Sequence, residues 1–112
     1  MNWLGMFAGL SGALAVLAGA FGAHGAEGRA AELYRIGAQY QLAHAIVALV
    51  ALQLGARGPA WCFVAGAALF AGSLYALAEN GPRWLGPVTP VGGALMIAGW
   101  LWLAWTLGPG GR

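Results

Sequence analysis

The sequence contains no lysine and no aspartate, and its charged residues make up only 7% of 112 positions. Soluble domains are about one quarter charged, so this chain has too little charge to surround a water-soluble core. Apolar residues make up 61% of the chain, which also contains 20 glycines and six tryptophans. This composition predicts an integral membrane protein. At about 20 residues per helical crossing, the length accommodates three or four spans.

Several further features are scarce. A single cysteine, Cys62, excludes an intrachain disulfide and a metal site built from thiolates alone, and its apolar neighbours indicate that the thiol fills space. The arginines are dispersed, so the basic cluster that nucleic-acid binding requires is missing. The only serines, Ser11 and Ser73, do not lie in a GxSxG motif. We therefore expect no nucleic-acid partner and no serine hydrolase.

Apolar runs separated by glycine, proline or charged residues predict an all-α membrane protein, a four-helix up-down bundle. No positive charge precedes the first run, which predicts an uncleaved anchor and not a signal peptide. The predicted spans are about 3–23, 39–54, 60–78 and 88–107, in a single domain over 1–112.

The connection at 24–38 carries half of the charged residues and should lie outside the hydrocarbon. Leu33, Ile36 and Tyr40 repeat at helical spacing, which predicts an interfacial helix running directly into the second span. An even number of crossings places both termini and the 55–59 turn on one side, here called the terminal side. The 24–38 and 80–87 connections then lie on the loop side. Tryptophans and tyrosines gather at both boundaries, as interfacial belts do.

Small residues recur every fourth position on several spans, a spacing that clears one helix face for close packing. The same faces could pack within the chain, in a homo-oligomer or against a larger membrane-protein complex, and the sequence leaves these uses open. The residues assigned to helix packing are Gly5, Gly9, Gly19, Gly22, Ala68, Gly72, Ala76, Gly92, Gly93 and Gly99.

Polar side chains of the spans gather toward the loop side. His44 falls inside the second span, where a polar group without a partner is costly, so we expect it to bond to Tyr75 or Glu79 and His24 to close the same site. These groups could simply satisfy one another, or they could leave a small polar pocket. The predicted cluster comprises His24, Tyr40, Gln41, His44, Tyr75, Glu79 and Thr89.

More specific functions, such as haem ligation, zinc binding or coupled transport, fit the sequence less well. Haem ligation by His24 and His44 would place the group at one membrane edge, and no CxxCH motif is present. Zinc would need Glu79 as a third ligand at a spacing that matches no local motif. A coupled transporter needs a buried carboxylate, and Glu79 lies only at the edge of a span. We expect no metal, no cofactor and no enzymatic activity.

Four segments in chain order resemble the signatures of the DUF423 family, also called UPF0382, which includes the eukaryotic transmembrane protein 256. They are GAFGAHG at 19–25, QYQLAHA at 39–45, LFAGSLY at 69–75, and TPVGG at 89–93 followed by Gly99-Trp100. One signature falls on each span, although Ala71 stands where the third signature would have serine. The resemblance implies a small inner-membrane protein, mitochondrial in eukaryotes. It does not point to an established biochemical activity.

Two roles follow as hypotheses. An accessory or structural subunit leads, because the chain supplies no nucleophile, cofactor motif or mid-membrane charge. The alternative is a binding module for a lipid headgroup, a quinone or another small ligand, and a small coupled transporter ranks third. The resemblance implies a multi-pass inner (plasma) membrane protein, and the basic tails of relatives favour cytoplasmic termini. The arginines do not decide the orientation, because Arg29, Arg35 and Arg83 on the loop side face Arg57 and Arg112 on the terminal side.

Overall fold

The computed structural model describes residues 2–111, so Met1 and Arg112 lie outside the described residues. The long helices are α1 (Trp3–His24), α2 (Gly28–Gln53), α3 (Arg57–Ala78) and α4 (Val88–Leu107), with short 3₁₀ helices η1 (Arg83–Leu85) and η2 (Pro109–Gly111). Four helical segments are long and apolar enough to cross a membrane, and residues 2–111 contain no strand. The predicted all-α membrane fold is confirmed, and the protein is a multi-pass membrane protein.

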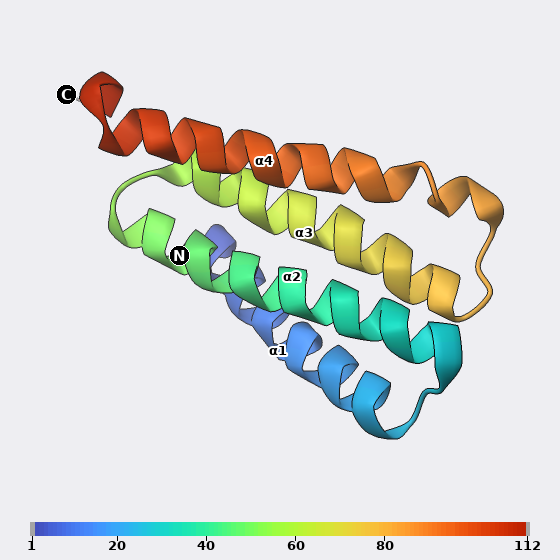
Figure 1. Ribbon diagram of the computed structural model, residues 1–112. Coiled ribbons are helices and arrows are strands. Elements are labelled where there is room, and N and C mark those ends of the chain that lie inside the picture. Colours follow the sequence, from blue (N-terminus) through green and yellow to red (C-terminus); the bar gives the residue numbers. More distant parts are fainter. Residues whose placement is uncertain (1, 112) are drawn as a thin grey trace.

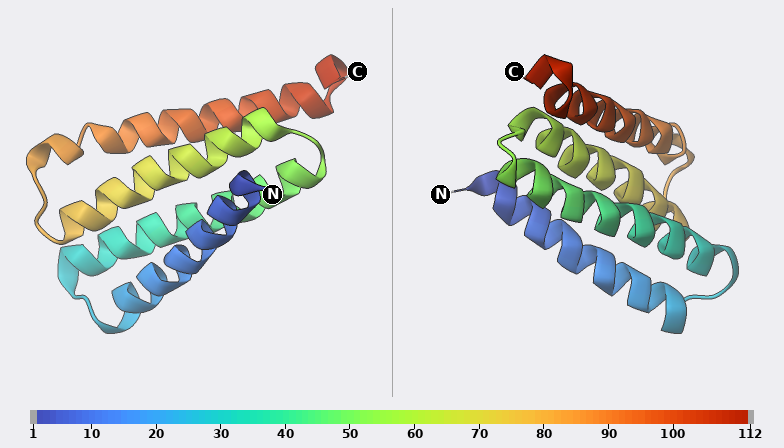
Figure 2. Two further views of the ribbon diagram at one scale, coloured as in Figure 1. Left: turned by 180° about the vertical axis from the view of Figure 1, so that it is seen from behind. Right: turned by 60° about the vertical axis from the view of Figure 1, so that its left-hand side comes forward.

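The helices form a row in which each one packs on the next along the chain (Figure 1). Two further views show the same order, with α1 crossing the row obliquely and α4 at the opposite edge (Figure 2). α1 also contacts α3 to a small extent, but α1 and α4 share no extensive interface. The bundle is therefore open, with the α2–α3 pair flanked by α1 and α4.

Two helix starts differ from the predicted spans. α2 begins at Gly28 and continues unbroken to Gln53, so the expected interfacial helix and the second span are one element. α3 begins at Arg57, three residues before the predicted start, because Pro59 falls in its first turn, where a missing N–H costs little. Asn80, with φ 64°, follows the end of α3 in the left-handed conformation that asparagine tolerates.

The core at the terminal side consists largely of alanine. Phe63 of α3 is its largest fully buried side chain, and Leu4 of α1 and Leu103 of α4 join it from the flanking helices. Small side chains bring helix backbones close together, so dispersion contacts accumulate over short interhelical distances. The alanines of this cluster are Ala8, Ala48, Ala51, Ala56 and Ala60.

The closest helix contact joins α3 and α4 through glycine. A Cβ added at Gly92 would lie 2.4 Å from the backbone nitrogen of Phe70 and 2.7 Å from the carbonyl oxygen of Gly66. A Cβ at Gly99 would lie 2.9 Å from the Cβ of Cys62. No side chain fits at these distances, so α3 and α4 meet backbone to backbone.

The other predicted packing glycines divide into two groups. At Gly22 an added Cβ would meet the Cβ of Tyr34 at 2.9 Å, and at Gly19 it would make ordinary contact with Ala38. These two positions therefore lie in the α1–α2 interface. Four other glycines do not pack against a neighbouring helix within this chain, because an added Cβ would meet only the N-cap side chain at Gly5, open space at Gly9 and Gly72, and one ring atom at 3.9 Å at Gly93.

Candidate functional site

His44 lies on α2 between two hydrogen-bond partners. Its Nδ1 lies 2.6 Å from the backbone oxygen of Tyr40, and the indole Nε1–H of Trp100 on α4 donates to His44 Nε2 at 3.0 Å. A carbonyl can only accept and an indole N–H can only donate, so the proton of the neutral imidazole resides on Nδ1. The side chain of His44 is 6% exposed and fully satisfied, and it links α2 to α4.

His44 lies far along α2 from the loop-side end of the bundle. It follows Tyr34 by ten residues on the same helix, a rise of about 15 Å. The hydroxyl of Tyr34 donates to Glu79 at the loop-side end of α3, so this bond marks the level at which α3 ends. Half of a hydrocarbon core has the same length, so a bilayer boundary at the Tyr34–Glu79 bond would put His44 near mid-depth.

Gln41 is the centre of a second contact, which joins three helices. Its Nε2–H donates to the hydroxyl of Ser11 on α1 at 3.1 Å, and its Oε1 accepts from the hydroxyl of Tyr75 on α3 at 2.7 Å. The Gln41 side chain is 5% exposed, so both ends of the amide are satisfied inside the protein. This network holds α1, α2 and α3 in register at one depth.

Two further side-chain contacts join neighbouring helices. Ser73 donates to the backbone oxygen of Phe70 at 2.9 Å, so its oxygen is left to accept from the Thr89 hydroxyl on α4. Tyr34 bonds to Glu79, and its ring stacks on that of Tyr75 with centroids 5.4 Å apart. Thr89, Tyr75 and Glu79 therefore contact other helices, as members of separate pairs.

The structure does not assemble the predicted residues into one cluster around His44. Tyr75 bonds to Gln41 and Glu79 bonds to Tyr34, so both predicted partners of His44 were wrong. The physical reason is that Nδ1 already donates within its own helix turn, so Nε2 needed a donor and not an acceptor. His24 is exposed at the end of α1, among the contacts of residues 2–111 it has no hydrogen bond, and it does not close this site.

Two partners were missed by the sequence analysis. Trp100 belongs to the fourth signature, and its indole N–H is a donor that must be satisfied when partly buried. Ser11 is the only hydroxyl-bearing residue in α1, and its place in an otherwise apolar helix is the signal that could have identified it. Both residues supply the group that completes a buried contact.

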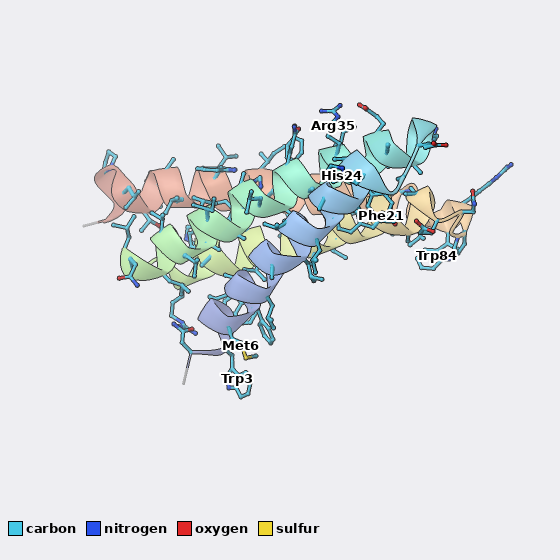
Figure 3. All side chains as sticks on the ribbon, turned by 90° about the horizontal axis from the view of Figure 1, so that it is seen from below. Trp3, Met6, Phe21, His24, Arg35 and Trp84 are labelled. Atoms are coloured by element: carbon cyan, nitrogen blue, oxygen red, sulfur yellow. The ribbon has the colours of Figure 1, made fainter. Side chains whose placement is uncertain are left out.

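A groove runs along α1, α2 and α3 on the side of Gln41. Its volume is about 510 Å³, within the range of small-molecule sites in proteins. Leu14, Leu17 and Phe21 of α1 form one wall, and Figure 3 shows Phe21 near the end of α1 opposite Trp3 and Met6. The remaining lining residues are Ala18, Tyr34, Gln41, Ala68, Gly72 and Tyr75.

The groove is amphipathic along its length. From Leu14 to Phe21 the α1 wall rises about 10 Å, and its deep part is lined by apolar or small residues, including Ala68 and Gly72. Its loop-side part is lined by Phe21, Tyr34 and Tyr75, with Phe21 edge-on to Tyr34 at a centroid separation of 4.9 Å. A molecule with an apolar chain and a polar end fits this gradient.

A smaller hollow of about 340 Å³ lies on the His44 side, lined by Tyr40, His44, Phe70, Trp100 and three further residues of α4. The ring nitrogens of His44 are both occupied, so the imidazole offers no free group to a ligand there. Residues 2–111 contain no group of three or more His, Cys, Asp or Glu side chains that could hold a metal ion. The groove on the Gln41 side is therefore the candidate site.

Comparison with known proteins identifies the family. The family described as "Protein of unknown function (DUF423)" matches residues 18–93. The UPF0382 membrane protein YwdK of Bacillus subtilis is 41% identical over 100 residues, which cover 79% of this chain and 81% of the relative. The UPF0382 inner membrane protein YgdD of Escherichia coli is 38% identical over 106 residues, covering 85% and 81%.

A UPF0382 membrane protein of Haemophilus influenzae is 41% identical over 106 residues, which cover 86% of each chain. No solved structure matches. The matched region includes the α1 wall of the groove from Ala18, all of α2 and α3, and the first turns of α4. The chain belongs to the DUF423 family, the family of the UPF0382 membrane proteins.

Proposed function

We propose that this protein binds one amphipathic molecule of the bilayer in the groove between α1, α2 and α3. The observation that carries the proposal is the combination, in one groove, of an apolar channel with a polar, aromatic end. The polar end is built from Tyr34, Gln41 and Tyr75, which two helices contribute. Sites for small ligands typically have apolar walls and a few convergent polar groups.

The position of the groove supports entry from the bilayer. Leu14 and Leu17 of its α1 wall are 56% and 66% exposed, so the groove opens sideways and not toward the core. Gly72, on α3, has open space where a side chain would stand. An apolar chain can therefore slide in from the surrounding lipid, with its polar end at the level of Tyr75.

Photolabelling tests this proposal. The full chain in lipid nanodiscs would be irradiated with a phospholipid that carries a diazirine on one acyl chain, and labelled residues would be mapped by mass spectrometry. Leu17 and Leu101 are 66% and 67% exposed, but only Leu17 lines the groove. We expect Leu17 to be labelled well above Leu101. Equal labelling of the two leucines would contradict the proposal.

The accessory-subunit role remains a second proposal, and one observation favours it. The open row leaves α1 and α4 without an extensive interface, and Gly9 on α1 is exposed with open space beside it. Another membrane protein could pack closely there, since small residues favour helix contact in membranes. Crosslinking in native membranes with mass spectrometry tests this role. A stoichiometric larger protein crosslinked through α1 near Gly9 would support it, and crosslinks to bulk lipid alone would contradict it.

A further inference from the structure

We propose that the molecule held in this groove carries an ammonium headgroup with N–H donors, which lies at the loop-side end near Glu79. This inference rests on the proposed binding function and names the chemical class of the ligand. It follows from three properties of the residues around the polar end: which protons are already used, where the charge lies, and which side chains are aromatic.

The hydroxyl protons at the polar end are already committed. Tyr34 donates its proton to Oε2 of Glu79 at 2.5 Å, and Tyr75 donates its proton to Oε1 of Gln41 at 2.7 Å. Each hydroxyl has only one proton but two lone pairs. Both phenol oxygens can therefore offer a ligand only acceptor lone pairs, and the complementary headgroup is a hydrogen-bond donor.

The residues that line the groove are uncharged, and the carboxylate of Glu79 lies beside its polar end, where it accepts from the Tyr34 hydroxyl. Glu79 is the C-cap residue of α3, where the helix dipole already favours cations, and its Oε1 is not used by Tyr34. None of the described residues that line the groove is basic. Arg35 of α2 pairs with Glu32. It lines two other hollows between α1 and α2, and not the groove that contains Gln41. The Glu79 carboxylate would repel an anionic headgroup at the polar end, and the groove lining holds no basic side chain to offset that repulsion.

Aromatic rings complete the match. Phe21, Tyr34 and Tyr75 contact one another in sequence at the loop-side end, and Phe21 remains 45% exposed. The face of an aromatic ring attracts an ammonium ion through its quadrupole. A carboxylate, two phenol oxygens and a ring face thus all favour a cation with N–H donors over a phosphate, a carboxylate or a sugar.

Competition between two lipids tests the inference. The full chain in a mild detergent would be given equal amounts of phosphatidylethanolamine and phosphatidylglycerol with identical acyl chains, and bound lipid would be counted by native mass spectrometry. We expect about fivefold preference for the ethanolamine lipid, the ratio that one partly exposed ion pair provides. In E79Q the amide still accepts from Tyr34, so the fold should persist while the preference falls to about one. Glu79→Asp should retain most of it.

The outcomes distinguish a failure of the headgroup inference from a failure of the proposed binding function. Gly72→Leu places a side chain in the groove, where nothing lies within 4 Å of an added Cβ, and should reduce binding of both lipids. If that variant loses lipid but the wild type binds both lipids equally, or prefers phosphatidylglycerol, the headgroup inference is wrong, whereas the proposal that the groove binds a lipid still holds. An E79Q protein that keeps the full preference also overturns the headgroup inference. If Gly72→Leu binds both lipids as well as the wild type, the proposed binding function fails.

Discussion

The indole of Trp100 on α4 donates a hydrogen bond to His44 on α2, and both rings pack against the ring of Phe63 on α3. The centroids of the Trp100 and His44 rings lie 5.9 Å apart, and the two rings are nearly perpendicular. α2 and α4 flank α3 and do not pack extensively on each other, so this bond is a direct polar link between them. It also explains why an apolar span tolerates a histidine, since neither ring nitrogen is left without a partner.

Trp100→Phe should destabilise the fold by about 0.5–2 kcal/mol, because an aromatic ring remains but Nε2 of His44 loses its donor. Equilibrium unfolding in mixed micelles, followed by helical circular dichroism, measures the change. Trp84→Phe is the control, since Trp84 is 67% exposed in η1 and projects away from the helices in Figure 3. Equal losses from the two substitutions would refute the structural role of the Trp100 bond.

Gly92→Ala and Gly93→Ala should differ sharply, although the residues are adjacent. At Gly92 the new methyl group would lie 2.4 Å from the Phe70 nitrogen, so α3 and α4 must separate at a cost of about 1–3 kcal/mol. At Gly93 the nearest atom is a ring carbon at 3.9 Å, and alanine's higher helix propensity should leave stability unchanged or raise it by up to about 1 kcal/mol. The same unfolding measurement compares them, and similar effects would contradict the backbone contact.

Gln41→Leu should remove the contact that joins α1, α2 and α3, at a cost of about 0.5–2 kcal/mol. Tyr75→Phe alone should cost less, because Gln41 would keep its bond to Ser11. In the Gln41→Leu background, Tyr75→Phe should cost almost nothing further, since the hydroxyl has already lost its acceptor. A double-mutant cycle gives this coupling, and strictly additive losses would show that Tyr75 and Gln41 do not interact.

The apolar runs predicted the helices and their order well, because length and hydropathy alone decide which segments cross a bilayer. The partners of each polar residue could not be predicted in the same way. Every side of these helices is apolar, so no amphipathic pattern indicates how each helix is rotated about its axis. Tyr75 and His44 were assigned to each other by expected depth. The rotation of α2 instead turns Gln41 toward α3 and His44 toward α4.

The groove was predicted only in part. The sequence placed Gln41, Tyr75 and Glu79 in a polar cluster near one membrane surface, but it centred that cluster on His44. Gly72 shows what the spacing of small residues cannot predict. Small residues at intervals of four predict a packing face, yet whether Gly72 meets a helix or a groove depends on the path of α1, which crosses the row obliquely (Figure 2).

The most direct test of the account compares Gly72→Leu with Gly9→Leu. An added Cβ meets open space at both positions, so both proteins should fold, but only the leucine at position 72 enters the groove. Each protein would be purified in the same mild detergent, and retained lipid would be measured by native mass spectrometry. We expect the wild type and Gly9→Leu to retain one amphipathic molecule per chain and Gly72→Leu to lose it. Equal retention by all three proteins would contradict the account.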